Sequence, residues 1–177
     1  MKTKTEKILT VMKYLALLAA IGFSIECGSE ILSFVASFIN PAWAERVYHV
    51  DLSIFSIRQQ SVTLYVYAMF IVIAVSALKS TVWYLVVDLL QKLRLQSPFT
   101  MLVTEKLEKI AYLLLAIWVI MSLIGKTYSH YLVEYIKIES PVITSGDEYL
   151  FIAGMVYIIS QIFKRGVEIQ EENELTV

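Results

Sequence analysis

Cysteine, glycine and proline are scarce in this chain, and each scarcity excludes a class of structure. Cys27 is the only cysteine, which rules out an intramolecular disulfide and a cluster of cysteine metal ligands. Six glycines and three prolines in 177 residues leave little material for flexible linkers. The net charge of −1 argues against a surface that binds nucleic acid, because such surfaces concentrate an excess of Lys and Arg. We therefore expect one domain with no direct nucleic-acid binding.

Familiar catalytic patterns are missing as well. The sequence has no Gly-rich phosphate loop, no His-Glu-x-x-His helix and no Gly-x-Ser-x-Gly elbow. His49 and His130 fall between predicted spans, and two histidines of unknown separation are weak grounds for a metal site. We interpret them as solvated loop residues. The sequence thus predicts no enzyme, no cofactor and no metal.

Apolar residues are abundant instead, and they predict a membrane protein. They make up 58% of the chain, and the mean hydropathy is +0.66. Apolar runs long enough to cross a bilayer indicate an all-α fold, a compact bundle of four transmembrane helices with short outer connections. The four predicted spans are 12–39, 61–90, 108–127 and 148–165, followed by a short acidic tail at 166–177.

The first helix is predicted over Glu6–Ile39 and ends at Asn40-Pro41, because proline cannot continue a helix. A lysine-rich start before an apolar run is also typical of a cleaved signal peptide. Helical spacing of apolar residues continues past Glu26 and Glu30 to Phe38, so we favour an uncleaved anchor helix.

Turn residues predict the other boundaries. Ser97-Pro98 suits a helix start, since serine caps and proline fits the first helical position. Asp147 or Glu148 opens the fourth helix, and Gly166 is well placed to cap its end. Alternation hints at a short strand over Val50–Ile54. At Glu134–Glu139 a strand competes with a helical continuation through Tyr135, which we favour.

The basic residues predict the orientation. Ten Lys and Arg flank one side of the predicted spans and four flank the other, so the positive-inside rule places both termini in the cytoplasm. The ten are Lys2, Lys4, Lys7, Lys13, Lys92, Arg94, Lys106, Lys109, Lys164 and Arg165.

Three charged residues fall inside the apolar spans. Glu26 and Glu30 are four apart on the first helix, and Lys79 interrupts the second. Counted from the cytoplasmic ends, Glu26 and Lys79 lie about 20 Å deep. A lysine near the bilayer centre costs roughly 2.5–3.5 kcal/mol, so we hypothesise an ion pair with Glu26 or Glu30. We favour a structural pair over a proton or substrate pathway.

Other polar residues of the spans have simpler expected roles. Asp88 and Lys92, one turn apart near the cytoplasmic surface, predict a local ion pair. Ser76, Ser160 and Gln161 can form hydrogen bonds between helices.

Two stretches resemble the bacterial family of four-helix membrane proteins known as domain of unknown function 2975. One is Leu93–Thr100, followed by Leu107 and Lys109–Ala111, and the other is the tail Phe163–Val177. The resemblance implies a protein of the bacterial cytoplasmic membrane and carries no established activity. It also implies a small helix-turn-helix regulator as a cytoplasmic partner, because such regulators are often encoded beside family members.

Both resembling stretches face the cytoplasm in the predicted orientation, one basic and one acidic. Two interpretations stay open: the stretches pack together and bind a partner, or each merely ends and caps its helix. They hold the candidate partner contacts Ser97, Pro98, Phe99, Glu171, Glu172, Asn173 and Leu175. The leading hypothesis is a membrane protein that tethers a cytoplasmic regulator. The alternatives are a small transporter or exporter subunit that uses Glu26, Glu30 and Lys79, and an immunity-type or stress-related membrane protein.

Overall fold

The computed structural model describes residues 4–40, 57–93, 98–137 and 146–174, and the regular structure within these ranges is helical. The predicted strand at 50–54, Ser97 and Leu175 lie outside the described residues. The elements, in chain order, are α1 (Lys4–Ile39), α4 (Val62–Lys92), α5 (Met101–Trp118), the π-helical segment η1 (Val119–Gly125), α6 (Lys126–Ile136) and α7 (Asp147–Glu174).

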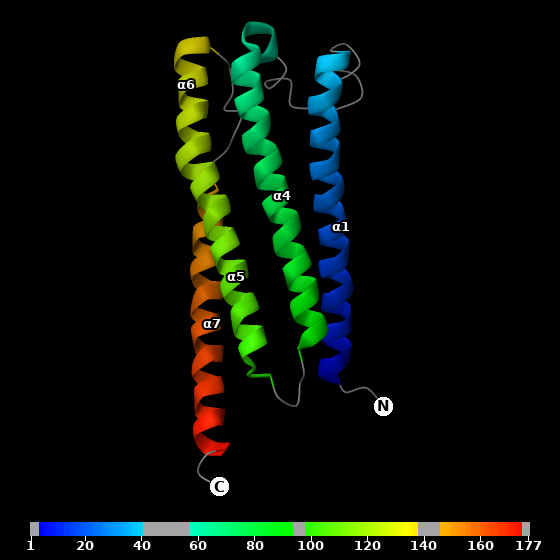
Figure 1. Cartoon of the computed structure of the whole chain (residues 1–177), viewed down its shortest axis with the longest axis vertical. Coiled ribbons are helices and arrows are strands. Elements are labelled where there is room, and N and C mark those ends of the chain that lie inside the picture. The colour runs from blue at the N-terminus through cyan, green and yellow to red at the C-terminus, as the bar shows by residue number, and fades with distance from the viewer. Residues whose placement is uncertain (1–3, 41–56, 94–97, 138–145, 175–177) are drawn as a thin grey trace.

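The described part of the chain forms four long helical rods, because α5, η1 and α6 run on as one continuous rod (Figure 1). Each rod is long and apolar enough to cross a membrane. The predicted all-α fold with four membrane-spanning helices is therefore confirmed. The predicted helical continuation through Tyr135 is confirmed by α6.

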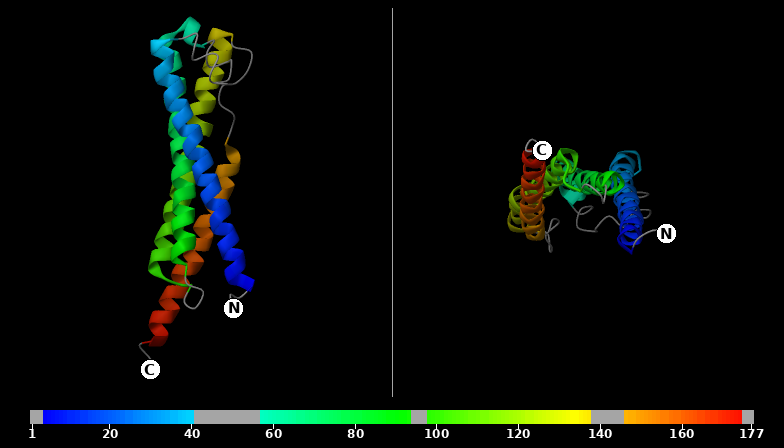
Figure 2. Two further views of the ribbon diagram at one scale, coloured as in Figure 1. Left: turned by 90° about the vertical axis from the view of Figure 1, so that its right-hand side faces the viewer. Right: turned by 90° about the horizontal axis from the view of Figure 1, so that it is seen from below.

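The rods stand in an open row. α4 packs against α1 on one side and α5 on the other, and α5 packs in turn against α7. Viewed from below, α1 and α7 stand at the two ends of this row (Figure 2). Both termini lie at the same end of the molecule, which we call the terminal end, and we call the opposite end the loop end (Figure 1). Four spans in alternating directions require this arrangement of the termini.

Small side chains let α1 approach α4 closely, since Ala16 and Ala20 pack against Val87. Larger side chains fill the rest of the core. Val75 of α4 packs with Ile117 of α5 and Ala153 of α7, and a separate cluster joins α4 to α6 at the loop end. Many large apolar side chains, such as Leu18 and Phe151, instead point outward. Such a surface suits lipid rather than water.

The third helix begins later than predicted. Pro98 is not helical, and α5 starts at Met101 with Thr100 as its N-cap, whose hydroxyl oxygen accepts a hydrogen bond from the Val103 N–H. The prediction of a start at Ser97-Pro98 is wrong because Thr100 offers an equivalent cap three residues further on. Pro98 and Phe99 thereby belong to the turn between α4 and α5.

The fourth helix starts at Asp147, as predicted, but it does not stop at Gly166. It continues to Glu174, and no glycine in the described residues has a positive φ. The prediction of a glycine cap is wrong, and most of the predicted acidic tail is helical. The sequence after Gly166 favours this outcome, because Glu, Gln and Ile follow and Arg165 reaches forward to Glu168.

Candidate functional site

The candidate residues fall into two groups that lie at different heights in the molecule. One group lines the contact between α1 and α4 within the membrane-spanning part, and we call it the polar seam (Ser24, Glu30, Ser76, Lys79, Ser80, Tyr84). The other surrounds Phe99 at the terminal end, and we call it the terminal-end cluster (Pro98, Phe99, Phe163, Gly166 and the α7 residues that follow).

Hydroxyl groups hold the polar seam together at its centre. The Ser24 and Ser80 hydroxyl oxygens are 2.8 Å apart, and the Tyr84 hydroxyl oxygen lies 3.3 Å from that of Ser24. Ser24 additionally lies 2.7 Å from the carbonyl oxygen of Ala20 in its own helix. These short side chains fix the height of α1 against α4, because a slip of either helix would break the bonds.

Glu30 lies further toward the loop end of the same seam. Its Oε1 accepts a hydrogen bond of 2.9 Å from the Ser76 hydroxyl of α4, so the predicted interhelical role of Ser76 is confirmed. Its Oε2 is enclosed and has no hydrogen-bond partner among the described residues. One turn on, the buried Ser33 hydroxyl is likewise without a partner there. The seam therefore encloses more polar groups than it satisfies.

Lys79 does not pair with a glutamate in the part of the chain that the structure describes. Its ammonium group lies 5.9 Å from the centre of the Phe23 ring, which is cation–π distance. Glu26, one turn from Glu30 on α1, is exposed. The structure thus replaces the hypothesised direct ion pair with two separate contacts, Lys79 on Phe23 and Glu30 on Ser76. The direction of the Lys79 side chain decides this, and sequence spacing does not report that direction.

The terminal-end cluster is built around the Phe99 ring. Its centre lies 5.2 Å from the centre of the Phe163 ring on α7. The ring also presses on the backbone of Gly166, where an added Cβ would come within 2.6 Å of the Phe99 Cδ1 atom. Gly166 is therefore needed for close approach rather than for a helix cap. Packing of the two resembling stretches against each other is found at these three residues.

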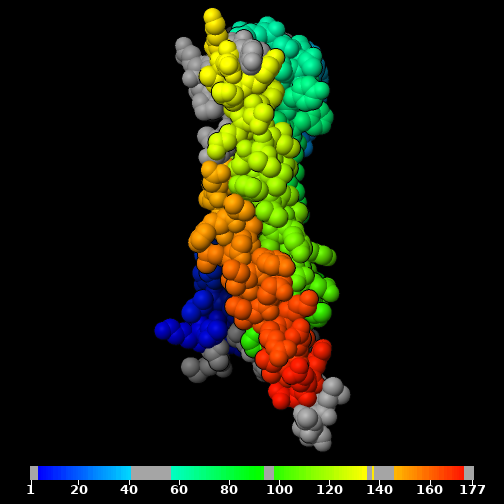
Figure 3. Space-filling model, turned by 90° about the vertical axis from the view of Figure 1, so that its left-hand side faces the viewer, coloured from blue at the N-terminus to red at the C-terminus, as the bar shows by residue number. Residues whose placement is uncertain are grey.

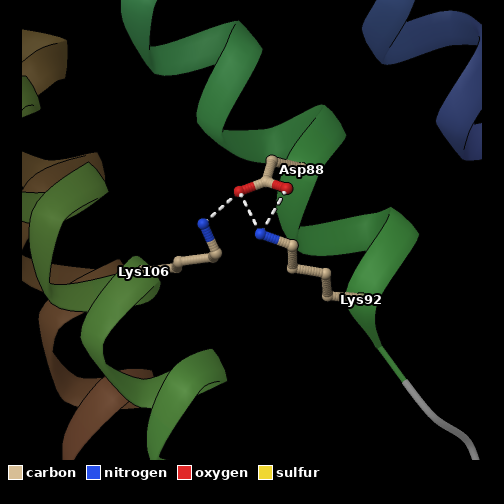
Figure 4. A network of polar contacts seen from close by, with 3 residues as sticks. All are labelled: Asp88, Lys92 and Lys106. Carbon is tan, nitrogen blue, oxygen red and sulfur yellow. Dashed lines mark hydrogen bonds and ion pairs between the residues drawn. The ribbon is translucent and has the colours of Figure 1, made fainter.

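A network of three charged side chains stands next to the same turn (Figure 4). Asp88 pairs with Lys92 one turn along α4 at 3.0 Å, which confirms the predicted local ion pair. Lys106 of α5 also pairs with the Asp88 carboxylate, and its side chain is only 16% exposed. Sequence reasoning missed Lys106. The sequence does contain a signal for this pair. Helices joined by a tight turn are neighbours, and Asp88 and Lys106 lie at similar distances in sequence from the turn.

Further contacts join α5 to α7, and the end of α7 extends beyond them. Gln161 donates a hydrogen bond of 3.1 Å to Oε1 of Glu108, as its predicted interhelical role requires, and Ser160 donates to the Tyr157 carbonyl of its own helix. Beyond Gly166, the last turns of α7 project past the other helices at the terminal end (Figures 1 and 3). Glu171, Glu172 and Asn173 are exposed there.

The structure offers no obvious place for a metal. No group of three or more His, Cys, Asp or Glu side chains that could hold an ion occurs within residues 4–40, 57–93, 98–137 and 146–174. His130 lies on α6 rather than in a loop, and its Nε2 is 3.2 Å from a Glu134 carboxylate oxygen.

The four-span helical chain, with its turn packed against its tail, agrees with the family comparison. The family described as protein of unknown function (DUF2975) matches residues 6–177. The chain belongs to the DUF2975 family. Neither a curated protein nor a solved structure matches it. The match covers all four spans, the Pro98-Phe99 turn and the projecting end of α7, so the terminal-end cluster lies within the family's shared region.

Proposed function

We propose that this DUF2975 protein is a multi-pass protein of the bacterial cytoplasmic membrane that tethers a small cytoplasmic protein at its terminal end. No catalytic step is part of this proposal. The observation that carries it is the projecting end of α7, a helix locked to the α4–α5 turn through Phe99 and Gly166 yet exposed beyond them.

The rigid base of this projection supports a docking role. A free tail would lose conformational entropy on binding, whereas a helix already held by Phe163 and Phe99 has lost it beforehand. The exposed surface is acidic, with Glu168, Glu171 and Glu172 on one short stretch, and Ile169 offers an apolar side chain beside them. A helix of this kind can enter the groove of a partner.

The charge of the projection points to a basic partner. Arg165 pairs with Glu168 at 2.8 Å and with Glu172 at 3.8 Å, which leaves the projection net acidic. Helix-turn-helix proteins, the partner class that the family resemblance implies, carry excess Lys and Arg to bind DNA. Docking on an acidic helix would compete with DNA for that basic surface.

The positive-inside rule supports the orientation that the proposal needs. Lys92, Lys106 and Arg165 all lie toward the terminal end, and both termini share that end. A reporter fused after Val177 should be active only if it is of the type that works in the cytoplasm. Activity of a reporter that works only outside the cytoplasm would show that the terminal end faces away from the cytoplasm. A cytoplasmic partner could not then bind there.

Co-purification from native membranes tests the tethering. The full chain should retain a stoichiometric small DNA-binding protein, and deletion of residues 167–177 should lose it. The double substitution Glu171→Lys and Glu172→Lys should have the same effect without shortening the chain. Glu105→Lys, which reverses an exposed charge on α5, is the matched control and should retain the partner. Repeated absence of any such protein from the intact chain would contradict the proposal.

A transporter role is the second candidate, and the polar seam is the observation that favours it. Glu30 and Lys79 both lie inside the membrane-spanning part, where ionisable groups often mark a pathway. In that case Glu26→Gln or Glu30→Gln should abolish the flux of the transported solute into proteoliposomes while the protein stays folded. Unchanged flux in both variants would contradict this role.

A further inference from the structure

The carboxyl group of Glu30 has far fewer partners than an ionised carboxylate needs. The Ser76 hydroxyl donates to Oε1, and Oε2 is enclosed without a hydrogen-bond partner among the described residues. An ionised carboxylate offers about four lone-pair sites. Removing it from water is expensive unless a cation and several donors replace the water. One donor and an enclosed second oxygen favour the neutral carboxylic acid over the carboxylate.

The two charges near Glu30 have opposite effects on its ionisation. The charged groups that act on it are Glu26, one turn away on α1, and Lys79 on α4. The Cys27 thiol of α1 also lies within electrostatic range. α4 is the helix that packs against α1 within the described chain. Glu26 repels a second negative charge, and the Lys79 ammonium is directed at the Phe23 ring instead of at the carboxyl group.

Lys79 can nevertheless reach Glu30 without any movement of the backbone. Lys79 follows Ser76 by three residues, so both lie on the face of α4 that meets α1. Phe23 and Glu30 are seven residues apart and share one face of α1. The Ser24–Ser80 and Glu30–Ser76 bonds place Lys79 at a height between Phe23 and Glu30. Rotation of its long side chain would therefore carry the ammonium from the ring to the carboxylate.

We propose that Glu30 is a reversible proton-binding site within the membrane, whose charge state decides whether Lys79 contacts Phe23 or Glu30. In the protonated state the O–H bond is on Oε2, Ser76 donates to Oε1, and Lys79 stays over Phe23. When the pH rises, that O–H bond breaks and the proton passes to water. Lys79 keeps its own proton and pairs with the resulting carboxylate. The ligand of the site is thus a proton, and the mobile element is one lysine side chain.

This site does not depend on the tethering proposal. Its charge state changes the contact between α1 and α4 at Phe23, far along the row from α7. The failure of either proposal would leave the other intact.

Infrared difference spectroscopy of the full chain in lipid nanodiscs, between acidic and alkaline buffer, tests the site directly. A carboxylic-acid C=O band should disappear as the pH rises. That band should be missing in Glu30→Gln. It should be present in Glu26→Gln and should disappear there at a lower pH, because the neighbouring negative charge has been removed. In Lys79→Met the band should persist to a higher pH, because the carboxylate loses its cation.

A second variant leaves Glu30 in place and guards against misfolding of the first. Ser76→Ala should move the Glu30 band to higher frequency, since the C=O group loses its hydrogen-bond donor. Two results would overturn the proposal. A spectrum with no band sensitive to Glu30 or Ser76 at any pH would mean that Glu30 is always ionised. A band that persists at alkaline pH would mean that it never releases its proton.

Discussion

The contact of α1 with α4 and the contact of α5 with α7 solve the same packing problem by different means. Small residues and hydroxyl groups join α1 to α4, with the Ser24–Ser80 contact at the centre. The Gln161–Glu108 hydrogen bond joins α5 to α7, and Phe99 of the turn just before α5 packs against Phe163 and Gly166 of α7. The first contact has its polar groups within the membrane-spanning part, and the second ends in the exposed projection of α7.

This difference suggests a division of roles. Within lipid, hydrogen bonds and close packing have to hold helices together, because burial from water supplies little driving force between spans. At the terminal end, the Phe99 ring packs on the backbone of Gly166. This contact sets the direction of α7 where it extends beyond the other three rods. The α1–α4 contact can therefore respond to charge inside the membrane, while the α5–α7 contact keeps the projection rigid.

The largest expected effect is at Gly166. Gly166→Leu should lower the free energy of unfolding by about 1–3 kcal/mol, the usual cost of overpacking, because its side chain would occupy the place of the Phe99 ring. Unfolding of the purified protein in mixed micelles, followed by circular dichroism, measures this. A loss of that size would show that the contact of α7 with the Phe99 turn depends on shape.

Gly154 on the same helix provides the matched control. An added Cβ there meets nothing within 4 Å, so Gly154→Ala should be neutral or stabilise by up to about 1 kcal/mol. Truncating the ring with Phe99→Ala should restore part of the stability lost in Gly166→Leu. Equal losses at Gly154 and Gly166 would contradict the role assigned to Phe99.

Gly166 also shows where prediction from the sequence ends. Hydropathy predicts all four spans, and Asn40-Pro41 predicts the end of α1, because both signals are local. Whether a glycine caps a helix or admits a neighbouring ring depends on a contact distant in sequence, here with Phe99. The pattern Lys-Arg-Gly is compatible with both outcomes, and the local pattern alone favours the wrong one.

The same reason explains the missed Lys106. Pairs within one helix, such as Asp88 and Lys92, follow from a spacing of four and are predictable. Pairs between helices depend on the rotation of each helix about its axis. That rotation is set by packing, so the sequence supplies candidates for such pairs and the structure selects among them.

The Asp88 network should show the next largest effect. Lys106→Met should lower the melting temperature more than Lys92→Met, because the Lys106 side chain is less exposed and joins two helices, whereas Lys92 lies on the same helix as Asp88. Melting curves at low and high salt measure the two variants. Lys109→Met, which changes an exposed lysine of α5, is the control. A larger effect at Lys92 would mean that the network does not connect α4 to α5.

A smaller effect is expected at Gln161. Gln161→Leu should cost about 1 kcal/mol, because Glu108 loses its hydrogen-bond donor. The loss should be absent when Glu108→Leu is already present, since the pair acts as a unit. Gln170→Leu changes an exposed glutamine of the same helix and serves as the control. Additive losses at 108 and 161 would show that the hydrogen bond contributes nothing to the α5–α7 contact.

The smallest effect should come from the seam itself. Ser80→Ala should cost about 0.6 kcal/mol, the average for a hydrogen bond between membrane helices, because Ser24 keeps a second acceptor in the Ala20 carbonyl. Ser24→Ala combined with Ser80→Ala should cost less than the sum of the single losses. Thr81→Ala is the matched control, because that hydroxyl donates only within α4, to the Ala77 carbonyl. If Ser80→Ala is no worse than Thr81→Ala, the hydroxyl pair does not set the height of α1, and close packing of Ala16 and Ala20 alone must hold the seam together.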